Sequence, residues 1–208
     1  MDRYRGKRAS MKIIGITGGV GAGKTQILKY IEEHYNSRII RADEVAHLLE
    51  EPGHECYHRL IALLGKDILD ADGNIVKGTM AAKIFADAGT LEKVNAIIHP
   101  EVKKYILGQI DLEQKADHVA FFFIEAALLI EEHYDEIVDE MWYIHTDEAV
   151  RRQRLAVNRQ YSEEKTESII RGQLSEAEFR RHCSVVITNN GDLEDTYQQI
   201  NNIMGEYV

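Results

Sequence analysis

The stretch of sequence that decides the fold is residues 18–25, which read Gly18-Gly19-Val20-Gly21-Ala22-Gly23-Lys24-Thr25. It fits the pattern G-x-x-x-x-G-K-[ST] of a phosphate-binding loop, or P-loop. Residues 12–17, just before it, are short, apolar and β-branched and predict a buried strand. Residues 26–35, just after it, carry apolar side chains at helical spacing. Since the motif requires a strand, a glycine turn and a helix in this order, the sequence predicts a nucleotide-binding site.

The residue types of this loop suit the chemistry of phosphate binding. Glycines let successive backbone N–H groups turn toward an anion, and the following helix adds its positive N-terminal end. Lys24 supplies a mobile cation for the outer phosphates, and the Thr25 hydroxyl is the expected ligand of Mg²⁺. An ordinary glycine-rich turn is the competing interpretation, which the flanking strand and helix disfavour. We therefore expect ATP to bind at Gly19, Val20, Gly21, Ala22, Gly23, Lys24 and Thr25.

Composition limits the kinds of partner. The chain has 208 residues, enough for one or two domains, and a formal net charge of -10. The negative net charge argues against nucleic acid as the main partner. No stretch reaches about 18 consecutive apolar residues, so the sequence predicts no membrane span. Two distant cysteines, Cys56 and Cys183, fit a reducing, cytoplasmic setting. We expect a small-molecule substrate, and the oligomeric state stays open.

Two acidic residues follow predicted strands. Asp43 comes just after the strand at residues 38–40, and Glu125 follows residues 118–124, an apolar run typical of a central parallel strand. Sites in parallel sheets gather at the carboxyl ends of strands. Asp43 there suits a carboxylate that orients or deprotonates a hydroxyl, and Glu125 suits a ligand of Mg²⁺ or its waters. A first-turn helix acid and a structural carboxylate are the respective alternatives.

Arginines gather between the predicted strands at residues 141–145 and 184–188. One explanation is a lid whose guanidinium groups grip transferring phosphates. The alternative is a solvated helix whose arginines pair with nearby glutamates. We expect one or two of these arginines to contact phosphate. The set comprises Arg151, Arg152, Arg154, Arg159, Arg171, Arg180 and Arg181.

These elements predict an α/β P-loop kinase fold in three layers, with a parallel sheet, a helical substrate lobe and a helical lid. The predicted nucleotide-binding core spans residues 11–50 and 118–208, with the lid at about 148–180. The helical lobe spans 51–117, and residues 1–10 form a basic extension. Within the lobe, His99-Pro100 predicts a helix boundary, because proline disfavours the α conformation of the preceding residue.

A second motif points to a different chemistry. His54, Glu55 and His58 fit H-E-x-x-H, a zinc-hydrolase pattern. The match falls directly after Pro52-Gly53, at a helix start, and lacks an obvious third ligand. Solvated helix residues are the preferred interpretation, and a zinc hydrolase stays an alternative.

The ordered set of motifs resembles the dephospho-CoA kinase family from Met11 to Met204. Only the P-loop is specific by itself, so the order of the segments carries the resemblance. The matching segments are residues 15–25, Ala42-Asp43, Glu51-Pro52-Gly53, Asp72-Gly73 with Lys77, Ile84-Phe85, Leu91-Glu92 through His99-Pro100, Leu128-Leu129-Ile130-Glu131, Arg154-Leu155, Arg159, Gln173 and Asn189-Asn190-Gly191.

This resemblance implies phosphorylation of the ribose 3′-hydroxyl of dephospho-CoA by ATP with Mg²⁺. It implies that Asp43 is the catalytic acid/base and that Lys24 and a lid arginine, Arg154 or Arg159, act on the transferring phosphoryl group. Asp43, Lys77 and His99 are then expected to contact the acceptor, and Thr25 and Glu125 the metal. The chain departs from the family pattern at Arg41, Ala127, Ser184 and Thr188.

Two further alternatives share the P-loop. The chain could be a kinase for another nucleoside or nucleotide, or an ATP-binding protein that has lost phosphoryl transfer, as Arg41 and Ser184 suggest. Measuring the release of ADP with different substrates would distinguish these alternative functions.

Overall fold

The structure is a computed structural model that describes residues 11–87 and 89–207. The chain divides into two compact units. The sheet unit comprises residues up to Ile39 and from Asp117 onward, and the helical unit comprises Ile40–Ala116. The predicted basic extension at residues 1–10 lies outside the described residues.

The sheet unit is built on a parallel sheet, as predicted. Its strands are β1 (Lys12–Thr17), β2 (Ser37–Arg41), β3 (Phe121–Glu125), β4 (Glu140–His145) and β5 (Val185–Thr188), in the order β2-β3-β1-β4-β5. β1 pairs in parallel with β3 and β4, and β4 with β5. The β1–β3 register aligns Ile16 with Glu125. Because parallel strands end at the same edge, the P-loop and Glu125 emerge side by side.

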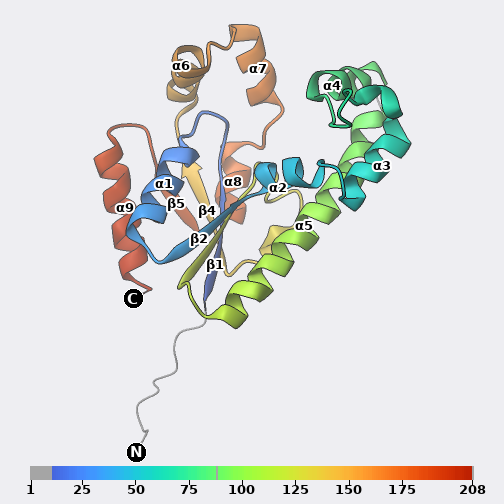
Figure 1. Ribbon diagram of the computed structural model, residues 1–208. Coiled ribbons are helices and arrows are strands. Elements are labelled where there is room, and N and C mark those ends of the chain that lie inside the picture. Colours follow the sequence, from blue (N-terminus) through green and yellow to red (C-terminus); the bar gives the residue numbers. More distant parts are fainter. Residues whose placement is uncertain (1–10, 88, 208) are drawn as a thin grey trace, which may run out of the picture. The chain divides into compact units, whose positions relative to one another are not determined.

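The two faces of β4 show how helices cover the sheet. Trp142 and Ile144 belong to a fully buried core shared with α1 (Lys24–His34) and α9 (Leu193–Gly205). Tyr143 points to the opposite face, where its ring stacks on Phe179 of α8 (Glu176–His182) with ring centroids 4.7 Å apart. After β4 come α6 (Glu148–Arg159) and α7 (Glu163–Arg171), beyond the carboxyl ends of the strands (Figure 1). A short 3₁₀ turn, η2 (Tyr134–Glu136), precedes β4.

The helical unit contains α2 (Ala42–Leu49), α3 (Glu55–Leu64), η1 (Lys66–Ile68), α4 (Lys77–Ala86) and α5 (Thr90–Ala116). α2, α3 and α4 all contact the long α5. The helical unit begins earlier than the predicted helical lobe, which was expected to begin at residue 51. The unit begins at Ile40 because α2 packs on α5 and α3, with Val45 and Leu49 buried.

The prediction of a helix boundary at His99-Pro100 was wrong, because α5 runs through Pro100. A proline inside a helix costs about 3 kcal/mol. Burial of one aliphatic side chain returns roughly 1.5–3 kcal/mol. Two residues before the proline and three after it are buried along α5, namely Val94, Ile97, Val102, Ile106 and Ile110. The burial of this face therefore outweighs the hydrogen bond that the proline removes.

Helix length and hydropathy bear on the membrane question. Within residues 11–87 and 89–207, no helix is both long enough and apolar enough to cross a membrane.

Candidate active site

The P-loop connects β1 to α1 and depends on its glycines. Gly23 is the N-cap of α1 and has a left-handed backbone, with φ of 89°. A Cβ at Gly23 would lie 2.4 Å from Nδ2 of Asn189, so only glycine fits there. The first turn of α1 holds no acidic residue. The positive end of the helix therefore faces no carboxylate of its own first turn, and this cradle fits the phosphates of ATP.

Lys24 lies against the loop that it belongs to. Its Nζ donates a hydrogen bond to the carbonyl oxygen of Gly18, at 2.8 Å, and lies 3.7 Å from Oε1 of Glu125. The pairing of β1 with β3 thus brings together two residues separated by about a hundred positions. Thr25 follows on the exposed side of α1. Its hydroxyl and the Glu125 carboxylate are oxygen ligands of the type that Mg²⁺ takes, so the residues present fit the metal.

Buried polar side chains behind the loop fix its backbone. The carbonyl oxygen of Ala22 accepts a hydrogen bond from Nδ2 of Asn189 at 2.7 Å, and Oγ1 of Thr146 lies 3.1 Å from it. Oγ1 of Thr196 in turn donates to Oδ1 of Asn189, at 3.0 Å. Asn189 and Thr146 each follow directly after an apolar strand, which is the sequence signal that could have marked them. The sequence analysis used Asn189 only as a family match and missed Thr146.

The lid arginines divide into two groups. Arg152 forms ion pairs with Glu148 and Glu167, Arg171 pairs with Glu167, and Arg180 pairs with Glu176. For these three, the arrangement of arginines paired with nearby glutamates is the one observed.

Two arginines of the predicted site lie on α6. Nη1 of Arg154 approaches the Ala22 carbonyl oxygen at 3.5 Å, which places this guanidinium beside the P-loop. Arg159 ends α6, where its hydrogen bond lowers the pKa of the Tyr161 hydroxyl. A third arginine, Arg151, also reaches the loop and was named in the sequence analysis only as part of the cluster.

Asp43 belongs to the helical unit. It lies exposed in the first turn of α2, after Arg41, which is the N-cap and has an extended backbone. Arg41 lies 3.8 Å from Glu44, so its charge is turned to a residue of the same helix. The first-turn position suits the helix dipole and also leaves the Asp43 carboxylate open to a ligand.

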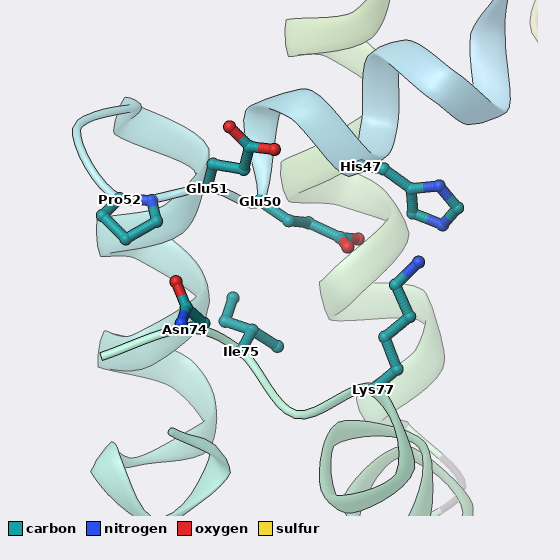
Figure 2. Close-up of a pocket in the computed structure, with 7 residues that line it drawn as sticks. All are labelled: His47, Glu50, Glu51, Pro52, Asn74, Ile75 and Lys77. Atoms are coloured by element: carbon teal, nitrogen blue, oxygen red, sulfur yellow. The ribbon is translucent and has the colours of Figure 1, made fainter. Parts of the chain in front are cut away.

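The helical unit also contains a pocket of about 350 Å³. One side comes from the end of α2 and the loop after it, and the other from a tight turn that leads into α4. Figure 2 shows the side chains of His47, Glu50 and Lys77 pointing toward one another on one side of the pocket. The lining residues are His47, Glu50, Glu51, Pro52, Asn74, Ile75 and Lys77.

Local hydrogen bonds explain how the turn places Lys77. Oδ1 of Asp70 accepts hydrogen bonds from the backbone N–H groups of Asp72 and Asn74, which lower the pKa of its carboxyl. Val76 then donates to the Ile68 carbonyl oxygen at 2.8 Å, and α4 begins at Lys77. Lys77, predicted to bind the acceptor, therefore lies at a fixed position on the pocket wall.

The pocket carries charges of both signs. Burial raises the pKa of the Glu50 carboxyl, and the nearby His47 and Lys77 offset this in part. A polar ligand with an anionic group would find the Lys77 ammonium group and the His47 imidazole on the same side of this pocket.

The remaining histidines of the sequence analysis lie elsewhere in the helical unit. His99 is partly buried in the middle of α5. In the H-E-x-x-H stretch, His54 is the N-cap of α3 and has an extended backbone, so of the two histidines only His58 lies within the helix. No group of three His, Cys, Asp or Glu side chains within residues 11–87 and 89–207 could hold a metal ion.

A parallel sheet with a P-loop after its central strand, and arginine-bearing helices after β4 that reach that loop, defines a P-loop kinase. Comparison with known proteins gives the family. The sequence model for dephospho-CoA kinase matches residues 12–195, and the chain belongs to that family. The predicted resemblance and the predicted P-loop kinase fold are thereby confirmed.

Individual relatives agree with the family assignment. The chain is 33% identical over 189 residues to a dephospho-CoA kinase of Streptococcus agalactiae serotype III, covering 91% of this chain and 95% of the relative. It is 32% identical over 197 residues to one of Carboxydothermus hydrogenoformans, covering 95% of each. The solved dephospho-CoA kinase from Campylobacter jejuni shares the fold, with a TM-score of 0.69, 18% identity and coverage of 93% and 96%.

Proposed function

We propose that this chain transfers the γ-phosphoryl group of ATP to the ribose 3′-hydroxyl of dephospho-CoA. The observation that carries the proposal is the P-loop with Lys24 held between Gly18 and Glu125, in a chain that the dephospho-CoA kinase family matches over residues 12–195. Phosphoryl transfer asks for little covalent chemistry from the protein, so alignment and neutralisation of charge supply most of the rate.

The residues of the sheet unit would bind the donor. Amide groups of residues 19–25 and the Lys24 ammonium group hold the phosphates, while Thr25 and Glu125 provide oxygen ligands for Mg²⁺. When bound, the metal neutralises charge on the β- and γ-phosphates. Arg154 or Arg159 is proposed to contact the phosphates from the lid. The hydrogen bond of Arg154 to the Ala22 carbonyl oxygen favours Arg154.

The residues of the helical unit would bind the acceptor. Asp43 is proposed to orient the 3′-hydroxyl and to accept its proton, which suits an exposed carboxylate at the start of α2. Lys77 and His47 are proposed to bind an anionic part of dephospho-CoA in the pocket of the helical unit. His99 is assigned to the acceptor by the family resemblance.

Lys77→Ala is expected to raise the KM for dephospho-CoA by roughly 10-fold and to leave the Kd for ATP unchanged, because a charged hydrogen bond contributes about 1.5–3 kcal/mol. Steady-state kinetics with varied acceptor, together with calorimetry of ATP binding, measure both quantities. Lys66→Ala is the matched control, since Lys66 is an exposed lysine of the same unit outside the pocket. An unchanged KM in Lys77→Ala would remove Lys77 from the acceptor site.

The proposed reaction is tested by release of ADP from ATP and Mg²⁺, with and without dephospho-CoA. Strong stimulation with a 3′-phosphorylated product is the expected result. Bound ATP without stimulation would refute the proposed acceptor and direct attention to the departures at Arg41, Ala127, Ser184 and Thr188. A panel of nucleosides and nucleotides would then identify another acceptor or show that transfer is lost.

The state of the two cysteines accords with a cytoplasmic enzyme. Both thiols are free and buried, and burial raises the pKa of Cys56 to about 11 and that of Cys183 to about 12. Such thiols stay protonated at neutral pH, so we assign them no part in the reaction.

A further inference from the structure

The guanidinium group of Arg151 lies directly on the P-loop. Arg151 is in the first turns of α6, and its Nε donates a hydrogen bond to the carbonyl oxygen of Val20, at 3.0 Å. A Cβ placed on Gly19 would lie only 2.3 Å from the guanidinium carbon of Arg151. The glycine at position 19 therefore permits this close approach.

Gln173 completes the arrangement from beyond the end of α7. Its Oε1 accepts a hydrogen bond from the backbone N–H of Val20, at 3.3 Å, and another from Nη2 of Arg151. We call this set of three residues, Arg151, Gln173 and Val20, the loop clasp. The clasp occupies both backbone polar groups of Val20, a residue of the phosphate-binding loop.

Arg151 differs from the adjacent Arg152 in the groups that its guanidinium contacts. Within the described part of the chain, no ion pair joins Arg151 to a carboxylate, whereas the adjacent Arg152 pairs with both Glu148 and Glu167. The partners of Arg151 are an amide oxygen and a carbonyl oxygen, and burial lowers its pKa below the ordinary value for arginine. A half-buried guanidinium whose hydrogen bonds go to neutral oxygens gains free energy when an anion reaches it.

The place of the clasp indicates which part of a nucleotide that anion would be. The P-loop lysine serves the β- and γ-phosphates, and Lys24 is folded back onto Gly18 at the start of the loop. Arg151 lies on the next two residues, Gly19 and Val20. The terminal phosphate is thus the group nearest to the clasp.

We propose that Arg151 is a lid residue that binds the terminal phosphate of the bound nucleoside triphosphate, and that Gln173 is a positioning residue that holds the Arg151 guanidinium over the P-loop before the nucleotide binds. On nucleotide binding, the Arg151 guanidinium exchanges the Val20 and Gln173 oxygens for phosphate oxygens, and the Val20 N–H is released to the phosphates. The proposal rests on the proposed function only in taking ATP as the donor, and it requires no particular acceptor.

Nucleotide binding in the full-length protein, without any acceptor, tests the role of Arg151. Arg151→Ala is expected to raise the Kd for ATP by roughly 10–100-fold and the Kd for ADP by no more than about 3-fold, because the charge-assisted contact is to the third phosphate. The Kd for ATP of Arg151→Lys should lie between those of Arg151→Ala and the wild type, since lysine keeps the positive charge but loses the bidentate geometry of the guanidinium. Arg152→Ala is the matched control and should leave both constants unchanged.

Two results would overturn the assignment of Arg151. An ATP Kd unchanged in Arg151→Ala would mean that the guanidinium does not reach phosphate. An equal rise in the Kd values for ATP and ADP in Arg151→Ala would mean that Arg151 only supports the P-loop. If the wild type failed to phosphorylate dephospho-CoA while the expected binding pattern held, the proposed acceptor would fall and the assignment of Arg151 would stand.

The role of Gln173 is tested by two substitutions of the same residue. Gln173→Glu places a carboxylate against Arg151, so ATP must break an ion pair, and its Kd should rise roughly 10-fold above that of Gln173→Ala. The difference should shrink at high salt, which screens the pair. Equal Kd values in the two variants would show that Gln173 does not control the position of Arg151.

Discussion

Lys24→Ala is expected to abolish measurable phosphoryl transfer and to weaken ATP binding together. Lys24 is the cation of the P-loop, and its side chain is only 13% exposed, held by the Gly18 carbonyl oxygen and near Glu125. A group that stabilises transition-state charge in phosphoryl transfer contributes about 10³–10⁵-fold in rate. We expect turnover to fall by roughly 10³-fold or more and the Kd for ATP to rise by roughly 10-fold or more, since each tenfold change corresponds to about 1.4 kcal/mol.

Lys29→Ala is the control for this substitution. Lys29 is on the same helix, exposed, and paired only at 3.7 Å with Glu33. Surface pairs of this kind contribute about 0–1 kcal/mol, so Lys29→Ala should bind ATP and turn over as the wild type does. Calorimetric titration of ATP and steady-state release of ADP measure both variants. Intact ATP binding and turnover in Lys24→Ala would remove the P-loop from the mechanism.

The P-loop itself could be predicted from the sequence because its chemistry is local. The motif, the apolar strand before it and the helix after it are contiguous, so backbone propensities and residue spacing already specify the cradle. The position of Glu125 could also be predicted, because an acid at the end of a buried parallel strand must lie at the edge where the P-loop emerges; its role as a metal ligand stays a prediction. The register that aligns Ile16 with Glu125 gives the structural basis of that prediction.

The support of the loop was harder to predict, because it depends on long-range pairing. The position of Asn189 and Thr146 after apolar strands marks them only as candidates, and their contacts with Ala22 span more than a hundred residues, so the sequence does not specify the partner. The lid shows the same limit. Arg151 and Arg152 are adjacent and chemically identical, yet one contacts the P-loop and the other pairs with two glutamates. Only the direction of each side chain from α6 separates them.

The helical unit shows where a local rule fails. Proline disfavours the α conformation of the residue before it, yet the buried face of α5 keeps the helix intact at Pro100. Similarly, residues 42–50 were assigned to the nucleotide-binding core, but α2 packs against α5, with Val45 and Leu49 buried. In both cases tertiary burial decided between two locally acceptable structures.

Asp43→Asn is expected to keep the affinity for ATP and to lower turnover by roughly 10²-fold or more. A positioned general base contributes about 10²–10⁴-fold, and asparagine preserves the size of the side chain while removing its ability to accept a proton. Because Asp43 is exposed in the first turn of α2, the substitution should cost little stability. Calorimetry of ATP binding and initial rates at saturating dephospho-CoA separate binding from chemistry.

The neighbouring acid provides the control that makes the Asp43 experiment specific. Glu44 lies one residue further along α2 and is also a first-turn acid, but it faces Arg41 at 3.8 Å. If the first-turn position mattered only through the helix dipole, Glu44→Gln and Asp43→Asn would have similar small effects, worth about 0.3–1 kcal/mol of stability each. If Asp43 accepts the proton of the 3′-hydroxyl, only Asp43→Asn loses turnover, while its melting temperature changes no more than that of Glu44→Gln. Near-normal turnover in Asp43→Asn would assign this carboxylate to the helix start alone.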